Sequence, residues 1–227
     1  MNRSSSHAPP DSRLLNVAID LFGQVGLDGV STRELASLAN TQMSSIGYHF
    51  GSKVGLHLAA AQHIADTIGA RVRPLLVAAR ELRKSSDDAE VARLALRQIL
   101  IGMLNVIVTE EFAADSRFVA REQANPGAAF EILFREVMEP MLDELSRLIA
   151  CISGNQMSTQ ECRTRSVVLI GQVLVFRMAH ATALRAAGWS SIDEGGVRLL
   201  RHVIDEHVVA ICDRIEAAEP AQPKYIK

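Results

Sequence analysis

The sequence predicts an all-α protein with a small N-terminal three-helix domain and a larger C-terminal helical domain. Aromatic residues make up only 4% of the chain and hydrophobic residues 48%, and this leucine-, valine-, isoleucine- and alanine-rich composition fits helix packing better than a β-sandwich. Apolar residues recur at helical spacing, and no strand-like alternation competes with them. At 227 residues, the chain can bury a sizeable core in one or two domains.

Apolar periodicity and turn residues predict ten helices along the chain. Pro74 and Pro140 lie inside helical patterns and are expected to break or kink them, because proline lacks the backbone donor. Connections are expected at residues 85–88, at 153–155 and at Gly188. The predicted helices span residues 12–25, 32–39, 43–49, 53–72, 74–84, 88–108, 112–123, 127–152, 159–187 and 193–217.

The first predicted helix carries an apolar stripe. The next two helices are short and cannot bury much surface alone, so this stripe is expected to complete their core. Gly26 follows the stripe directly and is placed to end the helix. The stripe consists of Leu14, Val17, Ala18, Leu21, Phe22 and Val25.

The second predicted helix has a locally specified start and end. Ser31 can cap the backbone N–H of Glu34 while the Glu34 side chain reaches back, as in a capping box. Val30 and Leu35 occupy the positions of a hydrophobic staple around that cap. Asn40 tolerates the left-handed conformation that a sharp exit requires. Two short helices joined by a tight turn have the form of a DNA-reading helix-turn-helix.

The third predicted helix is expected to present polar side chains to DNA, while Ile46 and Phe50 restore the apolar spacing. Gln42 is the main candidate for a base edge, because an amide can bond adenine bidentately. Tyr48 and His49 are expected at phosphate or sugar, and the alternative for His49 is packing inside. The candidate DNA-contacting residues are Arg33, Thr41, Gln42, Ser44, Ser45, Tyr48, His49 and Lys53.

The charge of the chain does not by itself indicate a nucleic-acid binder. The formal net charge is −2, and residues 1–60 hold four basic and four acidic residues, which cancel. Binding would therefore depend on local placement rather than on a broad basic field. Arg33, Lys53 and the N–H groups at the starts of their helices can each meet a phosphate oxygen. The alternative is that both side chains are ordinary solvated charges.

Motifs in the first sixty residues carry a family resemblance. Phe-Gly-Gln-Val-Gly at 22–26, Ser-Thr-Arg-Glu-Leu-Ala at 31–36 and Tyr-His-Phe-Gly-Ser-Lys at 48–53 resemble the TetR family of bacterial transcriptional regulators. Two positions depart from that family, which usually has tyrosine where Gly47 stands and serine where Gln42 stands. Glycine leaves no side chain for a phosphate and costs a helix about 1 kcal/mol relative to alanine.

Motifs in the remainder resemble the branch of that family with a CerR-type C-terminal domain. They are Arg121-Glu122-Gln123, Met138-Glu139-Pro140, Leu169-Ile170-Gly171-Gln172, Phe176-Arg177 and Gly188-Trp189. The resemblance implies a homodimer with a DNA-binding domain at 11–52 and an effector-binding and dimerisation domain at 53–217. Composition adds a disordered arm at 1–10 and a tail at 218–227. The helix that starts at Lys53 would transmit effector binding to the DNA-binding domain.

Aromatic and polar residues gather in the larger predicted domain. Five of the seven phenylalanines and the only tryptophan lie between residues 112 and 189. A ligand pocket needs apolar walls with a few converging polar groups, and this set can supply both. The alternative is that the phenylalanines are core and that Arg177 pairs with Glu122 or another acid. The pocket candidates are Phe112, Phe118, Arg121, Gln123, Phe134, Gln172, Phe176, Arg177 and His180.

The last two predicted helices suggest a two-fold interface. Residues 167–179 are apolar nearly all round the helix, which requires burial on two sides. One side can be the chain's own core, and the other is expected to meet a second copy in a four-helix arrangement. The interface candidates are Val168, Val175, Val197, Leu200, Val203, Ile204, Val208 and Ile211.

Signals for a metal, a cofactor or catalysis are weak. His202 and Glu206 lie four residues apart on one helical face, but a solvated or interface role is preferred without a third ligand. Cys151, Cys162 and Cys212 lack metal-ligand spacing and are expected to be reduced thiols. No nucleophile elbow, phosphate loop or HExxH motif is present. We therefore expect no metal, no cofactor and no enzymatic activity.

The sequence also predicts a cytoplasmic protein with no membrane partner. The longest apolar run, at residues 167–179, is interrupted by Gln172 and Arg177 and falls short of the ~20 residues that a membrane span needs. Residues 1–11 lack the apolar segment of a signal peptide.

The main functional hypothesis is a ligand-responsive DNA-binding repressor. It would bind an inverted-repeat operator as a homodimer and be released by a small-molecule effector, and the resemblance hints at control of efflux or drug-resistance genes. One alternative is a DNA-binding protein that has no effector. Another is an all-helical enzyme or small-molecule-binding protein in which the first three helices are only structural.

Overall fold

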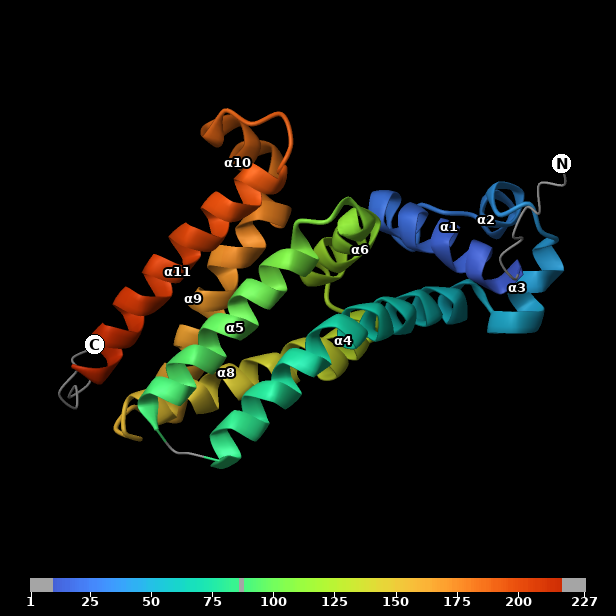
Figure 1. Cartoon of the computed structure of the whole chain (residues 1–227). Coiled ribbons are helices and arrows are strands. Elements are labelled where there is room, and N and C mark those ends of the chain that lie inside the picture. Colours follow the sequence, from blue (N-terminus) through green and yellow to red (C-terminus); the bar gives the residue numbers. More distant parts are fainter. Residues whose placement is uncertain (1–9, 86–87, 218–227) are drawn as a thin grey trace, which may run out of the picture. The chain divides into compact units, whose positions relative to one another are not determined.

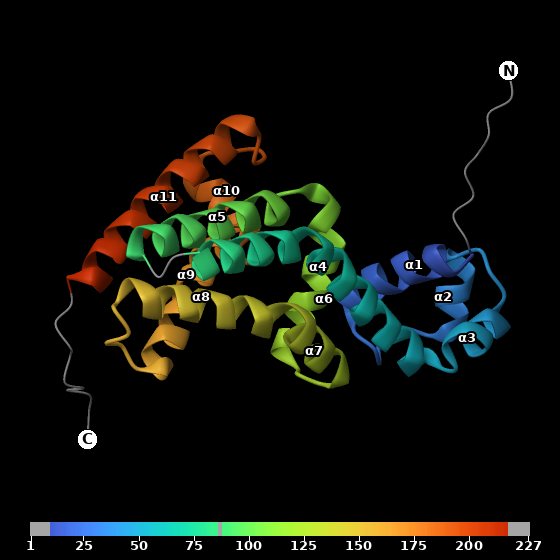
Figure 2. The ribbon, with the colours of Figure 1, turned by 60° about the horizontal axis from the view of Figure 1, so that its bottom comes forward.

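The computed structural model describes residues 10–85 and 88–217, and every regular element in these ranges is helical (Figure 1, Figure 2). The prediction of an all-α fold is confirmed. The arm predicted at 1–10, apart from its last residue, and the tail at 218–227 lie outside the described residues. The elements are α1 (Pro10–Val25), α2 (Thr32–Leu38), α3 (Met43–Phe50), α4 (Lys53–Ser85), α5 (Ala89–Ile107), the 3₁₀ turn η1 (Glu110–Phe112), α6 (Ala113–Ala124), α7 (Ala128–Leu133), the π-helical segment η2 (Phe134–Met138), α8 (Glu139–Ile152), α9 (Thr159–Met178), α10 (His180–Ala187) and α11 (Glu194–Glu216).

The chain divides into two compact units. The first unit contains residues up to 67 together with 113–136, and the second contains 68–112 together with the residues from 137 onward. This division does not coincide with the boundary expected after residue 52, because α6 and α7 group with α1–α3. Helix α4 contributes its first part to the first unit and its second part to the second unit.

Helix α6 packs against α1 where α1 has no side chain. A Cβ atom at Gly23 would lie 2.9 Å from the backbone nitrogen of Phe118, so glycine permits the close approach. Arg121 on α6 donates through Nε and Nη2 to the carbonyl oxygens of Gly23 and Gln24, at 3.2 and 2.6 Å. These bonds satisfy carbonyls at the end of α1 that have no partner within the helix. The same helices are joined by an ion pair between Arg117 and Asp20.

The expected break at Pro74 is wrong. Pro74 lies inside α4, which runs without interruption from Lys53 to Ser85. Proline removes the donor for the carbonyl four residues earlier, that of Ala70. Both Pro74 and Ala70 are exposed, so water can satisfy that carbonyl and the helix continues.

Two other predicted helices are each divided. Near Pro140 the chain stays helical but changes type, because α7, the π-helical segment η2 and α8 follow one another without a gap and Pro140 lies in the first turn of α8. The segment predicted as one helix at 159–187 is interrupted at Ala179, where α9 and α10 are bent by 84°. The predicted helix at 127–152 is therefore α7, η2 and α8, and 159–187 is α9 and α10.

The core of the second unit is built by α5, α8, α9 and α11. Helix α5 packs against the other three, and Leu96, Leu100 and Leu145 are fully buried among them. Arg97 on α5 donates to both carboxylate oxygens of Asp205 on α11, in the bidentate geometry that guanidinium favours. Buried leucines thus hold the helices together, and polar pairs at the rim fix their register.

No single one of the described helices is long and apolar enough to cross a bilayer, and two bent pairs of consecutive helices meet the length and composition criteria only when taken together.

Candidate nucleic-acid interface

The connection between α2 and α3 has the predicted helix-turn-helix geometry. Ser31 Oγ accepts a hydrogen bond from the Glu34 backbone N–H at 3.1 Å, which caps α2. Asn40 has a φ of 52°, in the left-handed region. The Thr41 N–H then donates to the carbonyl of Ala36 at 2.9 Å, as in a Schellman motif. The cap by Ser31 and the left-handed exit of α2 are confirmed, whereas the return bond of a capping box, from the Ser31 N–H to the Glu34 side chain, stays a prediction.

Helix α3 has one buried and one open face. Ile46 is 2% exposed and anchors α3, and Val30 and Leu35 are also buried, as a hydrophobic staple around the cap of α2 requires. Gln42, Ser44 and Tyr48 are exposed on α3 or at its start, and Tyr48 is 87% exposed. An exposed tyrosine of this extent is available to a partner rather than to the core.

Gln42 is exposed and lies directly before the first residue of α3. It is the N-cap residue of α3, yet its side chain makes no capping hydrogen bond. Its Oε1 accepts a long hydrogen bond from Ser44 Oγ at 3.4 Å, and this bond does not involve the donors of the amide NH₂ group. The side chain can therefore offer both donor and acceptor to a base edge.

Thr41 and Ser45 bond to one another. Thr41 Oγ1 donates to Ser45 Oγ at 3.0 Å, and both side chains are half-buried. Of the contact residues predicted at 41–48, Thr41 and Ser45 therefore stabilise the start of α3, whereas Gln42, Ser44 and Tyr48 are open to solvent.

His49 lies exposed, so the alternative that it packs inside does not hold. Its ring meets the ring of Tyr48 edge-on, with centroids 4.9 Å apart. This contact brings the two aromatic side chains together at the C-terminal end of α3.

Gly47 leaves open space on α3. A Cβ atom built at this position would meet nothing within 4 Å, so the absence of a side chain is not required by packing. Two apolar residues beside the motif, Met43 and Leu38, are 58% and 54% exposed. Neither was among the predicted DNA contacts, although Met43 at the first position of α3 can meet a thymine methyl group.

Lys53 has protein partners. Its Nζ donates to the carbonyl oxygens of Leu27 and Val30, at 2.8 and 2.9 Å, and the side chain is half-buried. An ammonium has three donors, so two of them hold the α1–α2 connection. A DNA phosphate would therefore have to compete with these two carbonyl oxygens for the Lys53 ammonium. Arg33, by contrast, is exposed at the start of α2 and can reach a phosphate.

A buried pair lies behind the motif within the first unit. His57 Nε2 on α4 is 3.0 Å from Glu122 Oε1 on α6, and both residues are less than 10% exposed. The His57 ring also meets the rings of Phe22 and Phe118, at 4.9 and 5.0 Å between centroids. Burial lowers the pKa of His57, and the neighbouring Glu122 carboxylate opposes that shift.

The predicted effector residues are divided between the two units. Phe118 and Arg121 are committed to contacts with α1 and α4, as described above. Phe134 stacks on Phe130, with centroids 5.9 Å apart. Those in the first unit are Phe118, Arg121, Gln123 and Phe134, and those in the second are Phe112, Gln172, Phe176, Arg177 and His180.

Arg177 binds backbone carbonyls rather than Glu122. Its Nε and Nη2 donate to the carbonyl oxygens of Ile107 and Thr109, at 2.9 and 2.5 Å. The alternative of a pair with Glu122 is wrong, because the Glu122 carboxylate meets His57. Arg177 thus satisfies carbonyls at the end of α5, in the same way that Arg121 does at the end of α1.

Among the predicted pocket residues, Gln172 has a buried side-chain nitrogen without a hydrogen-bond partner. Its Nε2 is buried and makes no hydrogen bond, while its Oε1 lies 3.3 Å from His207 Nδ1 on α11. His180 Nδ1 lies 3.0 Å from the carbonyl of Phe176 one turn earlier. These side chains belong to the α9–α10 and α11 segments of the second unit.

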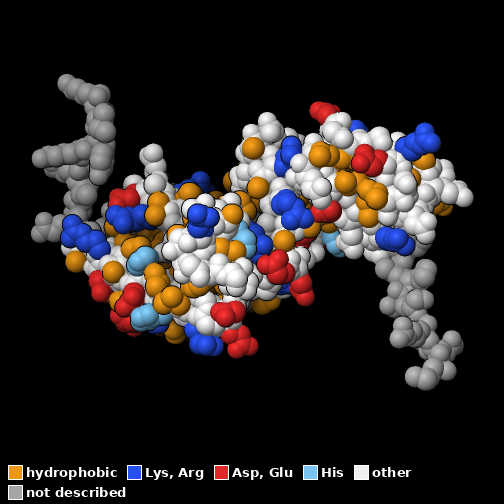
Figure 3. Space-filling view, turned by 90° about the horizontal axis from the view of Figure 1, so that it is seen from above, with side chains coloured by type: hydrophobic (Ala, Val, Ile, Leu, Met, Phe, Trp, Pro, Cys, Tyr) orange, Lys and Arg blue, Asp and Glu red, His pale blue; other side chains and the backbone are white. Residues whose placement is uncertain are grey.

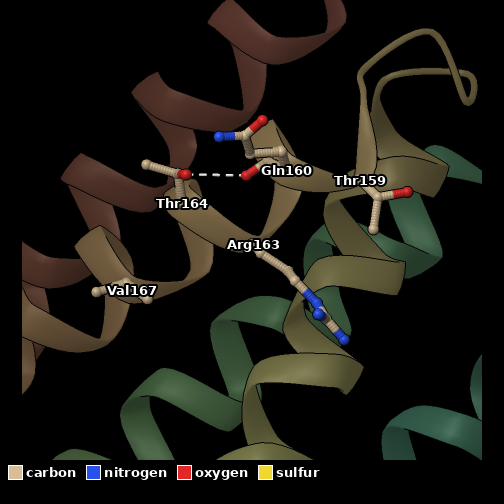
Figure 4. A pocket seen from close by; sticks show the side chains of 5 residues that line it. All are labelled: Thr159, Gln160, Arg163, Thr164 and Val167. Atoms are coloured by element: carbon tan, nitrogen blue, oxygen red, sulfur yellow. Dashed lines mark hydrogen bonds between the residues drawn. The ribbon is translucent and has the colours of Figure 1, made fainter.

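A surface hollow at the start of α9 involves none of the predicted pocket residues. In Figure 4, Thr164 Oγ1 donates to the carbonyl of Gln160 at 2.8 Å, while Arg163 extends toward α8. Arg163 Nη2 there donates to Asp143 Oδ1 at 3.0 Å. The lining residues are Thr159, Gln160, Arg163, Thr164 and Val167.

The predicted dimer residues fall into two groups. Leu200, Ile204 and Val208 are at most 5% exposed and pack in the chain's own core, so they do not face a partner and this part of the prediction is wrong. Val168 and Val175 on α9 are 64% and 44% exposed. Val197, Val203 and Ile211 are half-buried.

Other apolar side chains on α9 and α11 are exposed. Val167, Met178, Leu199 and Val209 are each at least 41% exposed. Figure 3 shows hydrophobic side chains open to solvent between charged ones on one face of the molecule. The outward residues of α11 were missed because the sequence alone did not settle which apolar side faces the core.

Two family models match the chain. One, described as bacterial regulatory proteins of the tetR family, matches residues 14–60, and the other, the C-terminal domain of the HTH-type transcriptional dual regulator CecR, matches residues 92–215. The chain belongs to the TetR family. It is 32% identical over 200 residues to CecR of Shigella flexneri, which covers 86% of this chain and 88% of that relative. The resemblance inferred from the motifs is confirmed, with the CecR-type domain as its branch.

Solved structures of low identity share the fold of this TetR-family chain. A Clostridium perfringens putative fatty acid metabolism regulator has a TM-score of 0.62 at 16% identity, over 91% of this chain and 99% of that one. AibR, solved in complex with isovaleryl coenzyme A and operator DNA, has a TM-score of 0.60 at 14% identity, over 89% of this chain and 97% of that one.

Membership in the family makes this chain a DNA-binding transcriptional regulator and not an enzyme. Within the part that the structure describes, no group of three metal-ligating side chains is found, and His202 lies 3.6 Å from Glu206 as an exposed pair. Cys162 and Cys212 are buried, and burial raises the pKa of Cys212 to about 11. A buried neutral thiol is a poor nucleophile.

Proposed function

We propose that this TetR-family regulator is a repressor that binds an inverted-repeat operator as a homodimer and is released by a small-molecule effector. The observation that carries the DNA-binding part is the open face of α3, where Gln42, Ser44 and Tyr48 are exposed while Ile46 is buried. A two-fold dimer presents two such faces, with half-sites one helical turn of about 34 Å or a multiple apart.

The exposed apolar side chains of α9 and α11 support the homodimer. Val167, Val168, Val175, Leu199 and Val209 are each more than 40% exposed. Burying them against a second copy would remove apolar area from water, and at an isologous interface the same side chains meet their counterparts. We therefore place the interface on this outward set rather than on Leu200, Ile204 and Val208.

Release by an effector is supported by a solved structure with the same fold and by one buried donor in this chain. AibR, which shares the fold, is described in complex with both isovaleryl coenzyme A and operator DNA, so this architecture accommodates a ligand. In this chain, Gln172 Nε2 is a buried donor without a protein partner and is the atom we would assign to a ligand. Control of efflux or drug-resistance genes is a further expectation.

A second candidate is regulation in both directions. CecR of Shigella flexneri is named a dual regulator, and this chain is 32% identical to it over most of its length. In that case the same protein would activate some promoters and repress others, with operator position deciding the outcome.

A gel-shift experiment on the DNA upstream of the protein's own gene tests the proposal. Retarded DNA that is competed by unlabelled operator but not by scrambled duplex would support it, and no shift at micromolar protein would contradict it. A small-molecule panel added to the shifted complex then tests release. If no compound releases the DNA while binding stays specific, the effector-independent alternative is favoured.

A reporter experiment distinguishes repression from dual regulation. Deleting the gene should raise transcription from a repressed promoter and lower it from an activated one. A uniform rise at all bound promoters would support the repressor, and a fall at any of them would support the dual regulator.

A further inference from the structure

A fully buried carboxylate in the second unit is surrounded by arginines. Glu144 on α8 is 0% exposed. Arg80 Nε lies 2.9 Å from its Oε2 and Arg83 Nε lies 3.5 Å from its Oε1, both from α4. Arg147, one turn later on α8, places Nη1 3.5 Å from Oε2. Because all three reach one carboxylate, the three guanidinium groups are close neighbours.

The positive charges of this cluster are not balanced by its carboxylates. Arg147 also lies 4.0 Å from Asp143, and Asp143 accepts from Arg163 at 3.0 Å. Four guanidinium groups therefore share two carboxylates among these described residues, which leaves a surplus of two positive charges. Guanidinium stays protonated at any physiological pH, so the surplus cannot be relieved by losing a proton.

The arginines have donors to spare at the surface. Their side chains are 40%, 29% and 52% exposed for Arg80, Arg83 and Arg147, although the carboxylate that they meet is completely buried. A guanidinium carries five N–H donors, and the contacts with Glu144 use only a few of them. Arg83 Nε and Glu144 Oε1 are both buried without a hydrogen-bond partner and lie 3.5 Å apart, so this N–H group faces the carboxylate. The donors left for a ligand are therefore the other N–H groups of the partly exposed guanidinium groups.

Glu144 holds these groups in position. A buried carboxylate keeps flexible arginine side chains near one geometry, so that less conformational entropy is lost when a ligand binds. Glu81, which lies between Arg80 and Arg83 in the sequence of α4, is paired with Lys84 at 2.8 Å. The arrangement is that of a preorganised anion site, with guanidinium forks that match the oxygens of a phosphate group.

We propose that the cluster of Arg80, Arg83 and Arg147, oriented by Glu144, binds the phosphate group of a small ligand. The site goes beyond DNA recognition, because none of its residues belongs to α1, α2 or α3. The ligand is either free inorganic phosphate or a phosphorylated small molecule, since both present the same oxygens to the guanidinium groups.

Isothermal titration calorimetry with three probes tests the site. Inorganic phosphate and glycerol 3-phosphate are titrated into the full chain, and sodium chloride at matched ionic strength is the control for screening. We expect both phosphates to bind and chloride to give no saturable heat. Tighter binding of glycerol 3-phosphate identifies a phosphorylated ligand, and equal or weaker binding identifies the free anion.

The variants Arg147→Gln and Arg185→Gln separate the cluster from surface charge in general. Both remove one exposed positive charge, but Arg185 lies on α10, outside the cluster. Arg147→Gln should weaken phosphate binding by about tenfold or more, as the loss of a charge-assisted hydrogen bond predicts, and Arg185→Gln should leave it unchanged. Equal weakening by both variants would overturn the proposal, as would no saturable binding to the wild-type chain.

Glu144→Gln tests the positioning role of the buried carboxylate. It adds one net positive charge to the cluster but releases the arginines, so phosphate binding should weaken although simple electrostatics would strengthen it. Stronger binding would refute the positioning role. If this variant does not fold, the comparison of Arg147→Gln with Arg185→Gln still decides whether the site exists.

Discussion

Replacing Lys53 by methionine tests whether this residue contacts DNA or shapes the motif that does. Methionine keeps most of the aliphatic chain and removes the ammonium that donates to Leu27 and Val30. Hydrogen bonds from a charged donor contribute about 1.5–3 kcal/mol each. Because Lys53 is only half-buried, we expect the low end for each of the two bonds, about 3 kcal/mol of lost stability in total.

The salt dependence of DNA binding separates the two roles. Each phosphate contact that is lost reduces the slope of log K against log salt by about 0.9. If Lys53 only holds the α1–α2 connection, Lys53→Met should weaken DNA binding at every salt concentration and leave the slope unchanged. Binding is measured by fluorescence anisotropy from low to physiological salt, and stability by urea denaturation.

Arg33→Met is the matched control. Arg33 is exposed at the start of α2 and is a predicted phosphate contact. We expect its loss to reduce the slope by about 0.9 per subunit while stability stays within about 0.5 kcal/mol. A reduced slope for Lys53→Met with unchanged stability would refute the positioning role and return Lys53 to the phosphate contacts.

Four further outcomes are expected. Gln42→Ala should relax sequence preference at one position per half-site by about 1–3 kcal/mol, and equal loss on specific and scrambled duplexes would remove Gln42 from base readout. Val168→Asp should convert the dimer to monomer in light scattering, because this side chain is 64% exposed and the fold does not need it, and a persistent dimer would place the interface elsewhere. Gly47→Ala should raise the free energy of unfolding by about 1 kcal/mol, because its Cβ has open space, and a destabilised variant would contradict that geometry. Cys212 should resist alkylation in the folded protein at pH 8, because its pKa is raised to about 11. The thiol of the unfolded chain ionises at a lower pH than that of the folded chain, so the free energy of unfolding should fall as the pH rises from about 9 toward about 11. Replacing Cys212 by serine should remove that part of the pH dependence, and an unchanged profile would reject the assignment.

Local chemistry made the first unit's motif predictable. The cap at Ser31, the left-handed Asn40 and the buried Ile46 all depend on residues within a few positions of one another. The helix break predicted at Pro74 was wrong because local sequence does not show which face of α4 is exposed. The cost of a proline inside a helix depends on whether the carbonyl that loses its donor can reach water. Helical periodicity likewise indicated apolar faces on α11 without indicating which face turns inward.

The sequence by itself determined the helical class, the helix-turn-helix and the family, because these depend on residues one to four positions apart and on short motifs. Tertiary structure alone decided the partners of side chains that lie far apart along the chain. Lys53 meets carbonyls 23 and 26 residues earlier, Arg177 meets carbonyls 68 and 70 residues earlier, and Arg80 meets Glu144 64 residues later. Such contacts depend on how the helices pack, since a long polar side chain binds whichever buried acceptor the fold brings within reach.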